Sequence, residues 1–143
     1  MEFFAKTFLE LTTDELYEIL KSRAEVFLLE QNIVCQDMDD DDRKSLHCFF
    51  RNGQRVIGYL RAFQVDDKIV KIGRVLTLEH KKGLGTMLMA KSIDEIKNHF
   101  NPSTLRVHAQ RQAEMFYEKQ GFVTVSDEYL EEGVVHVTME RKV

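Results

Sequence analysis

The segment HKKGLGTML, residues 80–88, places two lysines and two glycines directly before a helical pattern. A helix start presents free backbone N–H groups and the positive end of the helix dipole, and both attract anions. Lys81 and Lys82 add positive charge, and Gly83 and Gly85 leave the backbone open to close approach by a ligand. The segment therefore predicts an anion site, with phosphate as the natural ligand. The alternative is an ordinary helix start with lysines in solvent and glycines that ease a turn.

Two well-known phosphate loops do not fit this segment. The Walker A loop needs four residues between its glycines and a Gly-Lys-Ser/Thr ending, but here only Leu84 separates the glycines. The dinucleotide-binding loop needs a third glycine three residues after the second, where this chain has Leu88. A nucleotide-binding motif of either kind is thus excluded.

A second segment with chemical potential is AEMFYEKQGF, residues 113–122. Its spacing predicts a short helix with Ala113, Phe116 and Tyr117 on one face, ended by Gly121. A phenol with a pKa near ~10 is protonated at neutral pH and can donate a hydrogen bond to a leaving group. Tyr117 is therefore either a general acid or a core aromatic of an amphipathic helix.

The acidic run DMDDDD raises the question of a calcium site, since Asp37, Asp39 and Asp41 occupy alternate positions. An EF-hand requires Gly at its sixth position and Glu at its twelfth, where this chain has Asp42 and Cys48. The run is interpreted as a solvent-exposed acidic loop. No metal site is predicted, because the histidines and cysteines also lack a zinc-binding spacing.

The composition is that of a folded chain, with 43% apolar and 31% charged residues in 143 positions. One proline and no linker-like stretch predict a single domain over residues 1–143. The net charge of −4 argues against nucleic acid as the main partner. No segment is apolar enough for a signal peptide or a membrane span, so a cytoplasmic location with no membrane association is expected. Cys35 and Cys48 are expected to be reduced thiols.

The hydrophobic spacing indicates which elements hold these segments. Thr12 and Glu15 form a capping-box pattern, which marks the start of the most clearly predicted helix. Helices interspersed with hairpins predict an α/β fold with a mixed sheet. The expected elements are strand 3–11, helix 12–31, loop 32–45, a three-stranded meander 46–78, helix 84–100, strand 104–110, helix 111–120 and a hairpin of strands 122–130 and 134–142.

The two motifs together resemble the GNAT superfamily of N-acetyltransferases. The family's acyl-CoA loop reads Gln/Arg-x-x-Gly-x-Gly/Ala, and this chain has His80-Lys-Lys-Gly-Leu-Gly85. The family's later segment reads Ala-x-x-Phe/Leu-Tyr-x-x-x-Gly-Phe, and it is present in full at residues 113–122. The segments RAEVFLLEQNIVCQDMDDDD, LRVHAQ and EEGVVHVTM are similar to the ElaA-type branch, so the resemblance spans essentially the whole chain.

The resemblance implies the GNAT fold, with a central, mostly antiparallel mixed sheet flanked by helices, and transfer of acetyl from acetyl-CoA to a primary amine. The amine would attack directly in a ternary complex, and the acceptor would be a small molecule or a peptide. A non-catalytic acyl-CoA-binding sensor or scaffold is the alternative. The apolar strand faces belong either to the core or to a homodimer seam.

The resemblance also assigns roles to residues. Tyr117 corresponds to the general acid. The general base is left open among Glu79, at the end of the cofactor strand, Glu30, His108 and His136. The residues expected to contact acetyl-CoA or CoA are Val75, Leu76, Thr77, His80, Lys81, Lys82, Gly83, Leu84, Gly85, Thr86 and Gln110.

Overall fold

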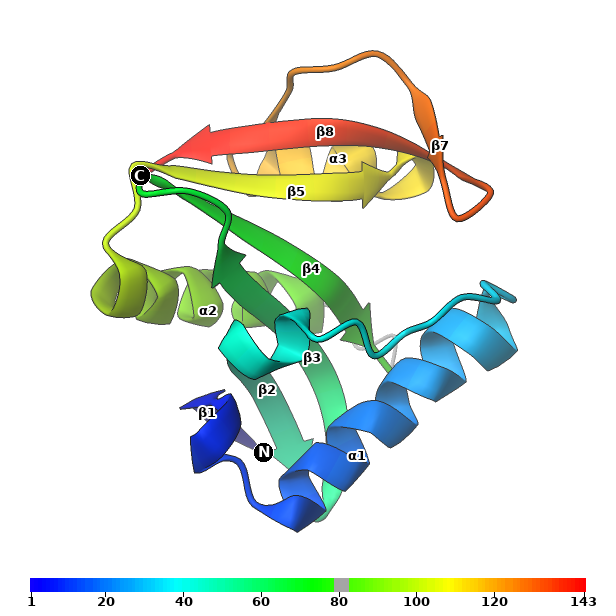
Figure 1. Cartoon of the computed structure of the whole chain (residues 1–143), viewed down its shortest axis with the longest axis vertical. Coiled ribbons are helices and arrows are strands. Elements are labelled where there is room, and N and C mark those ends of the chain that lie inside the picture. The colour runs from blue at the N-terminus through cyan, green and yellow to red at the C-terminus, as the bar shows by residue number, and fades with distance from the viewer. Residues whose placement is uncertain (79–82) are drawn as a thin grey trace.

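The computed structural model describes residues 1–78 and 83–143 (Figure 1). Glu79, His80, Lys81 and Lys82, four of the predicted site residues, lie outside the described residues. The main elements are β1 (Glu2–Thr7), α1 (Thr13–Arg23) with a π-helical extension (Ala24–Glu30), β2 (Leu46–Asn52), β3 (Arg55–Gln64), β4 (Ile69–Thr77), α2 (Leu84–Phe100), β5 (Thr104–Gln110), α3 (Glu114–Lys119), β6 (Val123–Thr124), β7 (Tyr129–Glu131) and β8 (Val134–Lys142).

The strands form one sheet in the order β1-β2-β3-β4-β5-β8-β6, with β7 paired to β8. Only the β4–β5 pair is parallel among the described strand pairs, and α2 connects these two strands. The predicted mixed, mostly antiparallel sheet is thus confirmed.

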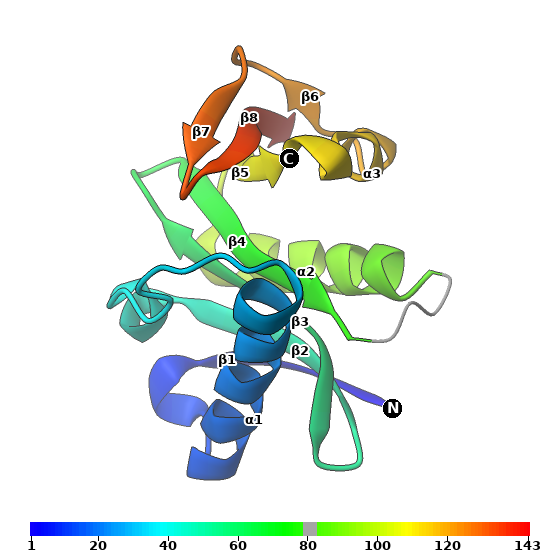
Figure 2. The same ribbon diagram turned by 90° about the vertical axis from the view of Figure 1, so that its right-hand side faces the viewer.

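The two long helices pack on opposite faces of the sheet, as Figures 1 and 2 show together. Neighbouring residues of β2 point to opposite faces, so Cys48 joins the cluster under α2 and Phe49 joins the cluster under α1. The buried residues of α2 in the first cluster are Leu84, Leu88, Met89, Ile93 and Ile96. No helix within residues 1–78 or 83–143 has the length and apolar character needed to cross a membrane.

The sheet splits between β4 and β5. The two strands pair only over Ile69–Ile72 and Thr104–Val107, and beyond this point they diverge (Figure 1). The split begins at a β-bulge of β4, where Arg74 has a left-handed φ of +54°. The edge of β4 from Gly73 to Thr77 that faces β5 therefore has no strand partner in the part of the chain that the structure describes, and a cleft opens beside it.

The predicted elements mostly agree with the structure. The capping box is confirmed, because the Glu15 N–H donates to Thr12 Oγ1 and the Thr12 N–H donates to the Glu15 carboxylate. The predicted strand 122–130 is wrong, since it consists of the two short strands β6 and β7. Between β6 and β7, the Ser126 hydroxyl accepts the N–H of Thr138 in the place of a strand carbonyl.

Candidate active site

The glycine segment leads into the start of α2, as predicted. Gly83 occupies the N-cap position with a left-handed φ of +90°, and no side chain caps the helix within the described residues. No acidic residue lies in the first turn of α2. The backbone N–H groups of Leu84, Gly85 and Thr86 therefore belong to a helix start whose positive end is not neutralised by the described chain.

The cleft beside this helix start, here called the helix-start cleft, has a volume of about 450 Å³. It is lined by Val75, Leu76, Thr77, Gly83, Gly85, Thr86, Ala113, Phe116 and Tyr117. The structure thus brings the unpaired edge of β4, the start of α2 and the predicted general acid together in one cleft.

Gly83 and Gly85 are suited to their positions for different structural reasons. A Cβ at Gly83 would have nothing within 4 Å, but the left-handed φ favours glycine at this position. A Cβ at Gly85 would lie 3.3 Å from Phe116 Cε1, which is tighter than ordinary packing. Gly85 therefore permits α3 to pack closely against α2.

Tyr117 lies where the helix-start cleft meets a second cleft. Its side chain is 7% exposed and packs between the rings of Phe116 and Phe122, with centroid distances of 5.2 and 5.7 Å. Burial raises the pKa of Tyr117, so its hydroxyl stays protonated well above neutral pH. Tyr117, Val75 and Ala113 line both clefts.

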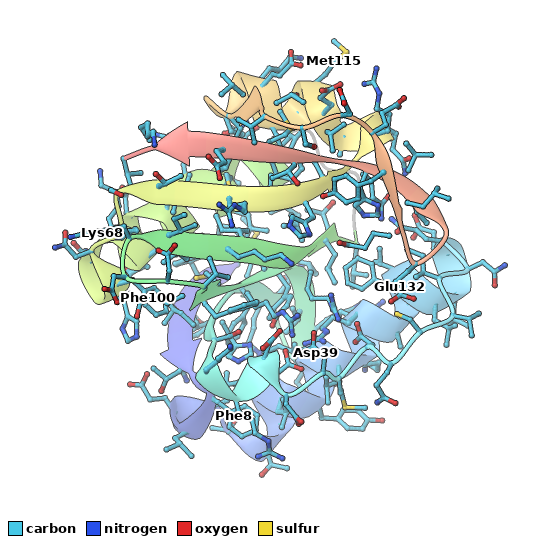
Figure 3. The ribbon with its side chains drawn as sticks, turned by 45° about the horizontal axis from the view of Figure 1, so that its top comes forward. Phe8, Asp39, Lys68, Phe100, Met115 and Glu132 are labelled. Carbon is cyan, nitrogen blue, oxygen red and sulfur yellow. The ribbon has the colours of Figure 1, made fainter. Side chains whose placement is uncertain are left out.

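The second cleft, here called the hairpin cleft, has a volume of about 320 Å³. It lies under the β7–β8 hairpin, and Figure 3 shows Glu132 at the tip of that hairpin. Burial lowers the pKa of Lys71, which is one of its lining residues. Its polar and charged lining residues are Gln31, Cys35, Asp37, Arg61, Lys71, Arg74, His108, Gln110, Gln112, Tyr117, Glu131, Glu132 and His136.

The prediction of a solvent-exposed acidic loop holds for Asp40, whose side chain is 97% exposed, but not for Asp37, Asp39 and Asp42, which are bound by arginines. Arg23, which is 1% exposed, donates to Asp42 at 2.7 Å and to Asp37 at 2.9 Å. Arg61 donates to both carboxylate oxygens of Asp39 at 2.7 Å and to Asp42 at 2.9 Å. Hydrogen bonds from Arg61 lower the pKa of Asp39 to about 2. The acidic segment is thus held by arginines that are distant in sequence.

Arg74 connects this cluster to the cleft. Its Nε donates to Asp37 at 2.9 Å, and Nη2 donates to the backbone carbonyl of Asp37. The bulge at Arg74 therefore has a tertiary partner that supports its strained backbone. Neither the bulge nor the pairing of Arg74 was apparent in the sequence, because both depend on contacts with residues far along the chain.

The candidate bases separate into two groups among the described residues. Glu30 ends the π-helical segment, is exposed and lines neither cleft. His108 and His136 both line the hairpin cleft, and both approach the carboxylate of Glu131, one of the two glutamates of the EEGVVHV segment. His108 Nδ1 lies 2.8 Å from Glu131 Oε1, and His136 Nε2 lies 3.7 Å from Glu131 Oε2.

Gln110 lies at the end of β5 and lines the hairpin cleft rather than the helix-start cleft. Its side-chain amide donates to Gln31 at 2.9 Å and accepts a hydrogen bond from Gln112 at 2.8 Å. The predicted contact of Gln110 with the cofactor therefore stays a prediction. Cys35 is exposed and Cys48 is buried, both as free thiols. No group of three or more metal-ligating side chains occurs in the described parts of the chain.

The family model of the acetyltransferase (GNAT) domain matches residues 10–143. This chain belongs to the GNAT acetyltransferase family. Protein ElaA of Escherichia coli is 34% identical over 94% of this chain and 92% of its own length. A UPF0039 protein of Schizosaccharomyces pombe is 36% identical over 97% of this chain and 95% of its own.

Solved structures of the family agree with this assignment. The crystal structure of E. coli ElaA superposes with a TM-score of 0.93 at 29% identity, covering 99% of this chain and 100% of that one. An acyl-CoA N-acyltransferase of Pseudomonas aeruginosa superposes with a TM-score of 0.91, also at 29% identity, with 99% of both chains covered. The predicted GNAT fold and the ElaA-type resemblance are confirmed, and the family is one of acyltransferase enzymes.

Proposed function

We propose that this GNAT enzyme transfers acetyl from acetyl-CoA to a primary amine in a ternary complex. The observation that carries the proposal is the junction of two clefts at Tyr117. One cleft contains a helix start and a strand edge that have no cap and no strand partner among the described residues, and the other has charged walls. A cofactor and an acceptor could thus occupy neighbouring clefts and react at their boundary.

The helix-start cleft suits acetyl-CoA. The N–H groups at the start of α2 would bind the pyrophosphate, with positive charge from Lys81 and Lys82. The unpaired backbone of Val75, Leu76 and Thr77 would hydrogen-bond the amide groups of the pantetheine arm, much as an added strand pairs with a sheet edge. A backbone N–H of this edge would stabilise the oxyanion.

Two structures with the same fold support this placement by analogy. An aminoglycoside 6'-N-acetyltransferase complexed with coenzyme A has a TM-score of 0.74 at 11% identity. A GNAT acetyltransferase of Elizabethkingia anophelis with acetyl-CoA bound has a TM-score of 0.64 at 14% identity. At these identities the likeness concerns the fold, so the ligand of the present chain rests on its own clefts.

Tyr117 would act on the leaving group. The amine nitrogen attacks the thioester carbonyl carbon, the C–S bond breaks, and the sulfur takes a proton from the Tyr117 hydroxyl. The proton that leaves the attacking nitrogen restores the phenol, so no free phenolate accumulates. Because burial raises the pKa of Tyr117, such a coupled exchange is favoured over a separate ionisation.

The test combines binding and turnover. Calorimetric titration with acetyl-CoA should show binding to the wild type and equal affinity for Tyr117→Phe, since the phenyl ring keeps the packing. Release of CoA thiol in the presence of a panel of primary amines should fall about 100-fold in Tyr117→Phe. An absence of acetyl-CoA binding by the folded wild type would refute the cofactor assignment. Unchanged turnover of Tyr117→Phe would refute the role of the phenol.

A further inference from the structure

We propose that His108, oriented by Glu131, is the general base that removes the proton from the acceptor's ammonium group in the hairpin cleft. The proposal rests on the proposed acetyl transfer and names a catalytic residue and a positioning residue for it. An amine is protonated at neutral pH and cannot attack a thioester until a base has taken a proton. The cleft that meets Tyr117 should therefore contain a base.

The hydrogen bond between His108 and Glu131 determines which ring nitrogen is available. A carboxylate can only accept hydrogen bonds, so the 2.8 Å contact requires that His108 Nδ1 carry the hydrogen. The hydrogen bond from His108 lowers the pKa of Glu131, which keeps this carboxyl ionised. In the neutral imidazole, Nε2 then holds the lone pair, and no partner of Nε2 is recorded among residues 1–78 and 83–143.

The position of His108 in the sheet directs it to the cleft. Along β5, Val107 and Ala109 are buried in the core, and His108 and Gln110 alternate with them on the cleft side. The His108 side chain is 28% exposed, so the ring can be reached from the cleft. The ring of Tyr129 in β7 packs edge-on against the His108 ring, with 5.9 Å between the ring centroids, and limits the rotation of the imidazole.

His136 is a weaker candidate for the same task. Its side chain is 9% exposed, its Nδ1 is 2.7 Å from the carbonyl of Val134, and its Nε2 is directed toward Glu131 at 3.7 Å. Both of its ring nitrogens thus face protein groups. The other charged groups of the cleft near this pair are Lys71, which has no ion pair recorded among the described residues, and Glu132 at the hairpin tip.

The proton balance is complete. The ammonium R–NH3⁺ gives one proton to His108 Nε2, which forms the imidazolium beside the Glu131 carboxylate. The resulting R–NH2 attacks the thioester and loses a second proton, which replaces the one that Tyr117 gives to the sulfur. His108 returns its proton to water after the N-acetyl product and CoA leave.

The experiment measures kcat/KM by CoA thiol release for His108→Gln, Glu131→Gln and the control His136→Gln. Two strongly basic amines, propylamine and benzylamine, are compared with two weakly basic ones, trifluoroethylamine and aminoacetonitrile. For the basic amines, kcat/KM should fall about 100-fold in His108→Gln and less in Glu131→Gln. For the weakly basic amines, which are already neutral, the loss should stay within about threefold.

The outcomes separate the two proposals. An equal loss with both kinds of amine, or a selective loss in His136→Gln instead, would overturn the role of His108 while leaving acetyl transfer intact. A wild type that binds no acetyl-CoA would instead overturn the proposed function. Binding of acetyl-CoA by each variant, measured by calorimetry, confirms that its fold and cofactor cleft are preserved.

If none of the four amines is acetylated, the NMR spectrum of the imidazole rings tests whether neutral His108 has the tautomer that a base in this cleft requires. Ring-nitrogen NMR of the wild type in mildly alkaline buffer, assigned with His108→Gln, should show the hydrogen of neutral His108 on Nδ1. In Glu131→Gln this preference should weaken, because an amide side chain can donate as well as accept. A hydrogen on Nε2 in the wild type would overturn the proposal.

Discussion

Two regions of the chain combine charged and polar groups, namely the acidic segment at residues 37–42 and the start of α2. They differ in whether these groups have partners within the protein. Asp37, Asp39 and Asp42 are bound by Arg23, Arg61 and Arg74. Within the described residues, the start of α2 has no side-chain cap, and its first turn contains no acidic residue. Three carboxylates of the first region are thus paired with distant arginines, whereas the second region presents backbone N–H groups to a cleft.

This difference indicates that the acidic segment stabilises the fold and that the start of α2 is available to a ligand. Buried charges are stable only when they are paired, and the arginine–aspartate cluster ties the end of α1 to β3 and β4. Backbone N–H groups at a helix start can remain free at the surface until an anion arrives.

The largest effect is expected for Arg23→Ala, because it leaves the Asp42 carboxylate with one of its two arginine partners and Asp37 with one of its two. The free energy of unfolding, measured by urea denaturation, should fall by about 3–5 kcal/mol. The matched control is Arg55→Ala, which removes a more exposed pair with Glu25 and should cost about 0–1 kcal/mol. Equal losses in both variants would contradict the view of the cluster as scaffold.

The second largest effect on the free energy of unfolding is expected for a substitution of Gly85, which packs against Phe116. In Gly85→Val the added atoms meet Phe116, and the free energy of unfolding should fall by about 1–3 kcal/mol. Phe116→Leu in the same chain should recover part of this loss in a double-mutant cycle. The control is Gly73→Val, since a Cβ at Gly73 has no atom within 4 Å. A cost of Gly85→Val that is independent of residue 116 would argue against the packing explanation.

The third effect is a change in acid stability. The folded pKa of Asp39 is about 2, below its value of roughly 3.9 in an unfolded chain. The ionised Asp39 carboxylate therefore contributes fully to the free energy of unfolding above about pH 4. This contribution is lost as the pH falls toward about 2. Asp39→Asn should therefore be less stable at neutral pH and show a flatter loss of stability across this range. Denaturation at stepwise lower pH measures both, and parallel curves for wild type and variant would refute the pairing.

The smallest effect on stability has the opposite sign. Thr86→Asp places a carboxylate in the first turn of α2, which should raise the free energy of unfolding by about 0.3–1 kcal/mol. The same carboxylate should repel the pyrophosphate and weaken acetyl-CoA binding in calorimetry. Met87→Asp, equal in charge but outside the lining of the helix-start cleft, should reduce binding less. Unchanged affinity in Thr86→Asp would argue against the helix start as the phosphate site.

The parts of the site that the sequence predicts are those encoded by local patterns. The helix start at Gly83, the Tyr117 segment and the capping box at Thr12 each depend on residues a few positions apart. The pairing of the acidic segment was not predicted because its partners, Arg23, Arg61 and Arg74, are separated from it by 14 or more positions, and no local pattern indicates their convergence.

The sequence by itself determined the family, the order of most elements and the two motifs that meet in the helix-start cleft. Only the tertiary structure decided that β4 and β5 diverge, that Tyr117 lies at the junction of two clefts, and that His108 is held by Glu131. Local propensity and hydrophobic spacing depend on residues within a few positions of one another, so their consequences can be predicted from the sequence. The pairing of charges between distant strands depends on sheet register and on the bulge at Arg74, which arise only when the whole chain has packed.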